Sequence, residues 1–202
     1  RLANLDWPGQ EELRERAEIA LFLADATPER INAFFANGAP TTGAGRAALA
    51  TAHMKSGNQA AAREHVAAAW REYLLSSTVE KKILDRFGSM LTKADHQARV
   101  DKLLFPDDEK TAEAALRVSK FLSAEAQKKV AARIAVVKRK ANAGKLLESI
   151  PAAATKGDVG LLYNKIQWLR RKDRDQEAWK MLLDVPSEPA HLFPPRGWRR
   201  CS

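Results

Sequence analysis

The stretch RAALATAHMKSGNQAAAREHVAAAWRE, from Arg46 to Glu72, decides the fold class of this chain. Alanine is the strongest helix former, and its small side chain lets two helix backbones approach closely. Gly57 can adopt the left-handed conformation that ends one helix, and Asn58 can cap the next through its side-chain oxygen. An apolar stripe then follows at three- and four-residue spacing: Ala62, Val66, Trp70 and Tyr73. The stretch predicts a helical hairpin, the unit that stacks in α-solenoids.

Two other stretches predict similar hairpins, Asp107 to Asn142 and Leu161 to Val185. The remaining sequence up to Pro186 reads as short helices joined by brief turns, without the alternation typical of strands. The longest loop is expected between Pro151 and Gly157. We therefore predict an all-α chain of about ten helices, arranged as an irregular α-superhelix, a solenoid of helical hairpins. A compact helical bundle is the alternative.

The domain organisation follows from the length of 202 residues, which can bury a substantial core in one domain. We expect the superhelical domain to cover residues 1–186 and an irregular C-terminal tail, either disordered or altered, to cover residues 187–202. The chain begins with Arg1 rather than Met, so we expect it to be cut from a longer protein. No apolar run approaches the roughly 20 residues that cross a bilayer. The single cysteine, Cys201, excludes an intrachain disulfide and a thiolate metal cluster.

The net charge of +9 is spread unevenly along the chain. Residues 1–101 contain 13 basic and 13 acidic residues, whereas residues 102–202 contain 21 basic and 12 acidic residues. The whole excess of positive charge therefore lies in the second half. Such a surface favours an anionic partner, which can be nucleic acid, anionic lipid or a polyanionic wall polymer.

Two dense basic segments and one tryptophan form the candidate binding site. Trp168 could stack on a sugar ring or a nucleobase while nearby arginines hold anionic groups. The competing interpretation is that Trp168 extends the core face of its helix and the arginines are solvated. The candidate residues for contact with a glycan or another partner are Trp168, Arg170, Arg171, Lys172, Lys138, Arg139 and Lys140. The other tryptophans that precede the tail, Trp7, Trp70 and Trp179, are interpreted as packing anchors.

Other titratable residues are explained better by packing than by catalysis. His53 and His65 lie on opposite arms of the first hairpin, where packing between helices is expected rather than a metal site. The segment from Asp95 to Asp101 is expected to form a network of ion pairs. Glu148-Ser149 faintly resembles the catalytic stretch of lytic transglycosylases, but the following Gly160-Leu161-Leu162-Tyr163 departs from it. We therefore predict no catalytic residue, metal or cofactor in this chain.

The order of several short motifs resembles a known family, the soluble lytic murein transglycosylases of proteobacterial type. The similarity is to their helical U-shaped domain and covers most of the chain from Trp7 to Pro189. The matching segments are Trp7-Pro8 with Leu13-Arg14-Glu15-Arg16-Ala17-Glu18, Pro40-Thr41-Thr42-Gly43-Ala44-Gly45-Arg46, Ala69-Trp70-Arg71, Asp95 to Leu104, and Tyr163 to Lys172.

The resemblance implies a periplasmic, peptidoglycan-facing parent protein. In this family an α-superhelix carries a lysozyme-like catalytic domain that cleaves the bond between N-acetylmuramic acid and N-acetylglucosamine, with a 1,6-anhydro product. The Glu-Ser and Gly-Leu-Met-Gln motifs of that domain have no match here, so we expect the chain alone to be inactive. The expected function is to position or bind murein glycan, with the glycan strands or the absent catalytic domain as partners. The alternative is a helical-repeat module that binds a protein or, less favoured, a nucleic acid.

Overall fold

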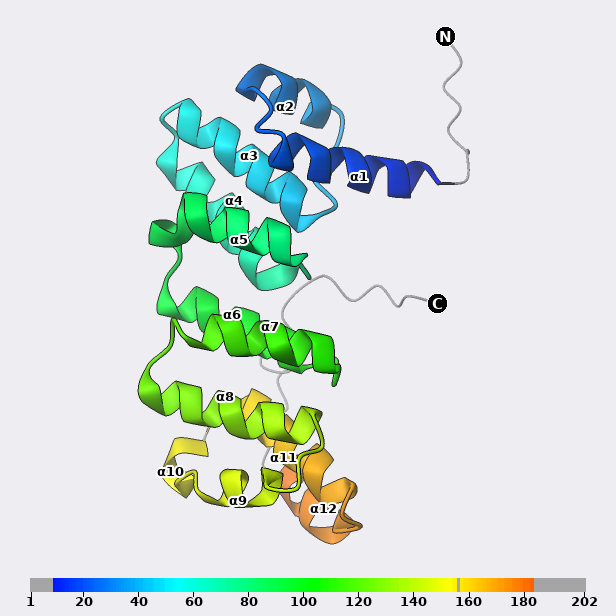
Figure 1. Ribbon diagram of the computed structural model, residues 1–202, viewed down its shortest axis with the longest axis vertical. Helices are drawn as coiled ribbons and strands as arrows, with labels where there is room; N and C mark the ends of the chain where they lie inside the picture. Colours follow the sequence, from blue (N-terminus) through cyan, green and yellow to red (C-terminus); the bar gives the residue numbers. More distant parts are fainter. Residues whose placement is uncertain (1–8, 156, 184–202) are drawn as a thin grey trace. The chain divides into compact units, whose positions relative to one another are not determined.

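The computed structural model describes residues 9–155 and 157–183 (Figure 1). Within these residues the chain forms twelve α-helices, one 3-10 helix and no strand, so the all-α prediction is confirmed. The expected loop between Pro151 and Gly157 contains a short helix, α10, which accounts for part of the higher helix number. The helices are α1 (Gln10–Leu23), α2 (Pro28–Phe35), α3 (Gly43–Lys55), α4 (Gln59–Glu72), α5 (Ser77–Phe87), η1 (Gly88–Met90), α6 (Lys93–Leu104), α7 (Glu109–Ser119), α8 (Ala124–Val137), α9 (Ala143–Glu148), α10 (Ala152–Thr155), α11 (Val159–Arg170) and α12 (Asp175–Leu183).

The spatial contacts between Cα atoms divide the chain into two compact units, Arg1–Asp95 and His96–Ser202. The predicted domain limit at residue 186 and the predicted tail, residues 187–202, lie outside the described residues. The same holds for Trp7. In the described part of the chain, no helix combines the length and the apolar character needed to span a bilayer.

Helices α3 and α4 form the most extensive helix–helix contact of the first unit, which agrees with close packing of their alanines. Gly57 has φ of 79°, and the side chain of Asn58 accepts a hydrogen bond of 3.1 Å from the backbone N–H of Ala61. Both helices contribute fully or nearly fully buried residues to the core: Ala47, Ala48, Ala50, Ala52, Ala62, Val66, Ala69 and Trp70. Trp70 is thus the large packing anchor that the sequence predicts.

Helix α1 buries a carboxylate. Glu18 is completely buried, and its two oxygens accept hydrogen bonds from the backbone N–H and hydroxyl groups of Thr41 and Thr42, at 2.7 to 3.1 Å. Leu13, which the apolar spacing of this helix would place in the core, is 67% exposed. Helix α1 therefore turns Glu18 rather than Leu13 toward the core. This orientation is stable because hydrogen-bond donors of the Thr41-Thr42 loop surround the buried carboxylate.

The glycines after Thr42 allow this loop to approach closely. A Cβ atom on Gly45 would lie 2.3 Å from a carboxylate oxygen of Glu18, and one on Gly43 would lie 2.4 Å from a methyl carbon of Leu75. Thr42 itself caps α3, because its hydroxyl oxygen accepts from the Gly45 N–H at 2.9 Å. The Thr-Thr-Gly-Ala-Gly segment is therefore a structural clamp around Glu18.

A second buried carboxylate, Asp95, lies at the start of α6. It accepts hydrogen bonds from the backbone N–H and hydroxyl of Thr92, both at 2.7 Å, and forms ion pairs with Arg63 and Arg71 of α4. Burial favours the protonated carboxyl, but the bonds from Thr92 and Arg71 outweigh burial and lower the pKa of Asp95. Asp95 therefore joins α4 to the beginning of α6.

The second unit has its core between α8, α9 and α11. The buried cluster consists of Ala132, Ala135, Val136, Ala143, Leu147 and Leu161. A smaller cluster, Ile166, Leu169 and Ala178 with Met181 against it, holds α12 on α11. Trp179 of α12 is 67% exposed, so its predicted role as a packing anchor is wrong. Its neighbour Ala178 enters the core instead.

Candidate binding surface

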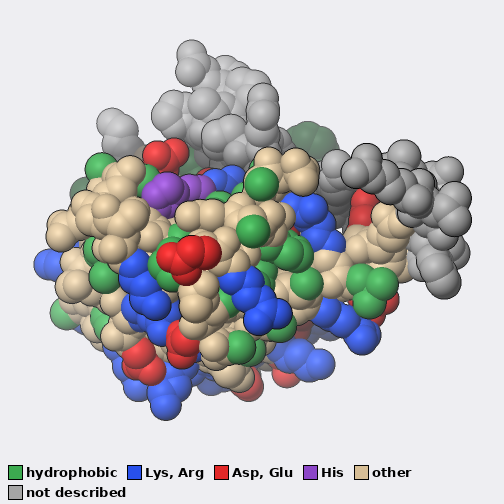
Figure 2. Space-filling view, turned by 90° about the horizontal axis from the view of Figure 1, so that it is seen from above, with side chains coloured by type: hydrophobic (Ala, Val, Ile, Leu, Met, Phe, Trp, Pro, Cys, Tyr) green, Lys and Arg blue, Asp and Glu red, His purple; other side chains and the backbone are tan. Residues whose placement is uncertain are grey.

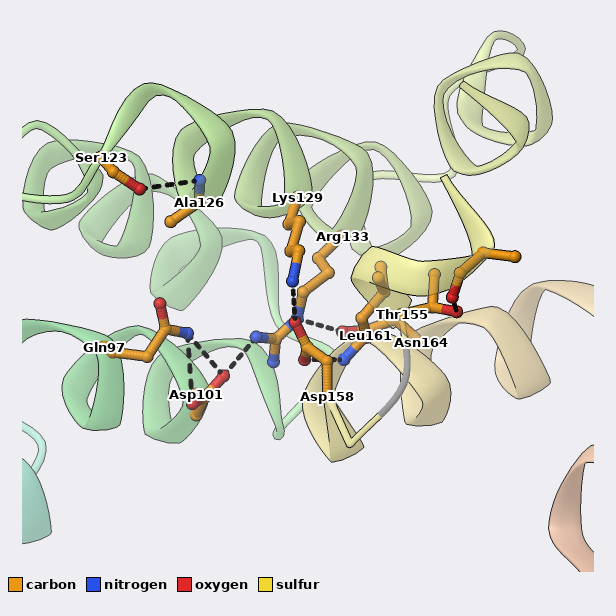
Figure 3. A network of polar contacts seen from close by, with 11 residues as sticks. Gln97, Asp101, Ser123, Ala126, Lys129, Arg133, Thr155, Asp158, Leu161 and Asn164 are labelled. Carbon is orange, nitrogen blue, oxygen red and sulfur yellow. Dashed lines mark hydrogen bonds and ion pairs between the residues drawn. The ribbon is translucent and has the colours of Figure 1, made fainter. Parts of the chain in front are cut away.

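Helices α8 and α11 run parallel in the second unit, and three polar contacts establish their register. Figure 3 shows the first two of them. Lys129 pairs with Asp158 at 3.2 Å, and the Nε of Arg133 donates to the side-chain oxygen of Asn164 at 2.8 Å. Near the far end of both helices, Arg171 donates to the carbonyl of Val136 at 2.9 Å. Residue numbers rise together along both helices, which brings their C-terminal ends to the same place.

Arg133 lies at the centre of this contact. Its side chain is only 3% exposed, and it forms an ion pair with Asp101 of α6 as well as the bond to Asn164. A Cβ atom on Gly160 would lie 2.7 Å from three atoms of the Arg133 guanidinium, so only glycine lets α11 approach it. Because Asn164 is also fully buried, this network aligns the two helices rather than meeting a ligand.

Both helices end in the same kind of turn. After α8, Arg139 has φ of 51° and the N–H of Lys140 donates to the carbonyl of Ala135 at 2.9 Å. After α11, Asp173 has φ of 56° and the N–H of Arg174 donates to the carbonyl of Leu169 at 3.1 Å. Basic side chains are favourable here, because the C-terminal end of a helix carries partial negative charge.

The two basic segments that are distant in sequence therefore become neighbours in space. Arg171 connects them, since it binds the last turn of α8 and pairs with Asp107. Lys138 pairs with Glu113 of α7 at 2.9 Å. Within the described ranges, four exposed cations of these turns have no ion-pair partner, and we call them the basic surface: Arg139, Lys140, Arg170 and Lys172. Asp173 is the acidic residue that adjoins it.

Trp168 is held by packing. It contacts both core clusters of the second unit, and a Cβ atom on Gly144 would lie 2.5 Å from a carbon of its six-membered ring. The guanidinium of Arg174 lies 5.4 Å from the ring centre while binding Glu177 in a bidentate manner. These neighbours support the packing interpretation of Trp168, and we leave it out of the basic surface.

Glu148 and Ser149 lie at the exposed end of α9. The Ser149 hydroxyl donates to the carbonyl of Leu146 at 2.7 Å, which is a local bond within one turn. A glycosidic general acid needs a carboxyl in a desolvating pocket, and the exposed Glu148 has no such surroundings. Among the residues with described positions, no three His, Cys, Asp or Glu side chains converge as metal ligands.

His53 and His65 stack across the α3–α4 hairpin, with ring centres 5.3 Å apart and planes inclined by 11°. The sequence therefore correctly predicts packing between the helices for this pair. The Nδ1 of His65 is buried and has no hydrogen-bond partner in the described part of the chain. Histidine side chains also reach the face drawn in Figure 2, where acidic and basic groups are interspersed around them.

The histidine pair predicts a pH dependence of stability. Burial lowers the pKa of His65 below its usual 6.5, the charges of Arg46 and His53 lower it further, and Glu64 opposes them. The unfolded chain then binds more protons than the folded chain, so the free energy of unfolding falls as the pH drops below about 6.5. Urea unfolding at a series of pH values should show this fall in the wild type and a smaller one in His65→Gln. The same pH slope in both proteins would contradict the prediction.

Comparison with known proteins gives no relative. No family model matches the chain, and no curated protein or solved structure matches it.

Proposed function

We propose that this chain is a non-catalytic helical scaffold of a lytic-transglycosylase-like protein, built as an α-superhelix and facing peptidoglycan in the periplasm. Its role is to hold murein glycan for a catalytic domain of the same parent protein. The observation that carries this proposal is the alignment of the two basic helix ends of the second unit, which gathers positive charge on a rigid support. Murein carries carboxylates on its peptide stems, and a scaffold that holds it needs such a surface.

Repetition of one turn supports the superhelical part of the proposal. Helices α1, α3, α8 and α11 end with the same hydrogen-bond pattern around one residue with positive φ. These residues are Asp25, Gly57, Arg139 and Asp173. In both units a later basic side chain also donates to the last turn of such a helix, Lys82 to Leu23 and Arg171 to Val136. Hairpins of one type with cross-links between them are the elements of helical solenoids.

The motifs that resemble those of lytic transglycosylases support the same proposal, because the folded chain uses them as structural elements. Thr41, Thr42 and Gly45 clamp Glu18, and Asp95 joins α4 to the first turn of α6. A motif that builds a scaffold is expected to persist in proteins that share the scaffold.

A specific observation favours a second candidate, a module that binds another protein. One face of α12 is apolar and open to solvent, with exposed fractions of 67% for Trp179, 44% for Leu182 and 84% for Leu183. Exposed apolar residues at this spacing are typical of helix faces that meet a protein partner.

Incubation of the chain with purified murein sacculi tests the proposed function. We expect the chain to bind the sacculi and to release no anhydromuropeptides, which chromatography of the soluble products would detect. Release of such products that disappears in Glu148→Gln would contradict the non-catalytic role. Binding to duplex nucleic acid but not to sacculi would contradict the murein-facing role.

A further inference from the structure

The basic surface is held in place by side chains that do not belong to it. Arg171 and Lys138 are engaged with Asp107 and Glu113, so their charges are largely compensated within the fold. The bond from Arg171 to Val136 O keeps the two turns together. The four remaining cations project from two neighbouring turns, and of these four Arg139 has a backbone conformation that is uncommon for a residue with a side chain. The arrangement therefore displays four charges at fixed backbone positions.

We infer that Arg139, Lys140, Arg170 and Lys172 form the site that binds carboxylate groups of the murein peptide stems. This inference rests on the proposed function and names the surface and the chemistry by which the chain recognises the polymer. A single exposed cation binds a carboxylate weakly, so a monovalent anion is held poorly. A polymer with several carboxylates engages both turns at once, and the second contact forms at high effective concentration.

Two acidic side chains also lie at this end of the unit, one from α7 and one from the loop before it. Asp107 pairs with Arg171 and Glu113 pairs with Lys138, and the four cations of the basic surface are left without an ion pair. The C-terminal dipoles of α8 and α11 reduce the local positive potential, which favours release of a bound anion at moderate salt. The site is thus expected to bind reversibly.

Co-sedimentation with murein sacculi tests the inference, with a variant that removes the four charges. The substitutions are Arg139→Asn, Lys140→Gln, Arg170→Gln and Lys172→Gln, in which asparagine suits the positive φ of residue 139. The matched control removes four charges from exposed lysines elsewhere: Lys55→Gln, Lys81→Gln, Lys120→Gln and Lys128→Gln. Circular dichroism checks that both variants are folded. If the four-residue variant is not folded, it is replaced by two variants that each remove the charges of one turn only.

We expect the four-residue variant to bind sacculi about ten-fold more weakly and the control to stay within about two-fold of the wild type. Sacculi whose carboxyl groups have been amidated should bind the wild type as weakly as native sacculi bind the variant. An equal loss in the control, or full binding to amidated sacculi, would overturn the inference while leaving murein binding intact. Loss of duplex nucleic acid binding by the variant, with sacculus binding unchanged, would also overturn it. Absence of wild-type binding to sacculi would instead refute the proposed function, and the inference with it.

Discussion

Glu18→Ala is expected to lower the free energy of unfolding by about 3 kcal/mol. The substitution removes the acceptor for two backbone N–H groups and two hydroxyl groups of Thr41 and Thr42. Because Glu18 is completely buried, water cannot replace the carboxylate without opening the loop. Urea unfolding followed by circular dichroism would measure the loss, and hydrogen exchange should show faster exchange in residues 39–46.

Two comparisons make this result specific. Glu15→Ala changes an exposed carboxylate on the same helix and should cost less than about 0.5 kcal/mol. Glu18→Gln keeps the shape of the side chain but turns an NH₂ group toward donors, so its cost should lie between the two alanine variants. Equal stability of Glu18→Ala and Glu15→Ala would show that the clamp does not hold the loop.

Arg133→Met is expected to destabilise the second unit by about 3 kcal/mol. Methionine fills part of the space but leaves the side-chain oxygen of Asn164 buried without its donor. Asp101 is 42% exposed and can be hydrated after the loss of its partner, so the unpaired Asn164 dominates the cost. Thermal unfolding and urea unfolding both measure this change.

A double variant separates the unpaired amide from other effects. Arg133→Met combined with Asn164→Leu removes both partners, and we expect it to be more stable than Arg133→Met alone because no buried polar group is left unpaired. Lys128→Met, on the exposed side of the same helix, is the control and should change stability by less than about 0.5 kcal/mol. A single Arg133→Met variant as stable as this control would contradict the structural role of Arg133.

Local features of this fold could be predicted from the sequence, since they depend on neighbouring residues. Asn58, Asp108 and Ser123 cap α4, α7 and α8 as their positions indicate, and Gly57 ends α3. The positive φ of Asp25, Arg139 and Asp173 could not be predicted, because none of these residues is glycine. Their turns are stabilised by backbone hydrogen bonds, which the residue type alone does not indicate.

The rotation of α1 could not be predicted, because its cause lies far along the chain. Glu18 is buried by donors 23 and 24 residues away, and this contact leaves Leu13 in solvent. The spacing of apolar residues indicates which face of a helix is buried, but it does not report a contact with a loop far along the chain. The same limit applies to Trp179, whose helix is anchored through the small Ala178.

The residues of the candidate surface were visible in the sequence, but their arrangement was not. The density of positive charge between residues 138 and 172 indicates an anionic partner. Which cations remain available depends on ion pairs with Asp107 and Glu113, and on the parallel packing of α8 and α11. These are tertiary contacts, so the reduction from seven candidates to four required the folded structure.

The fraction of the chain that sediments with purified murein sacculi, measured across a salt series, tests the central claim most directly. The claim is that this helical chain is a murein-binding scaffold. We predict that most of the protein sediments with the sacculi at low salt and that added salt releases it. Contacts between exposed charges are screened within about 10 Å at 0.1 M salt. A chain that stays in the supernatant at every salt concentration would contradict the claim.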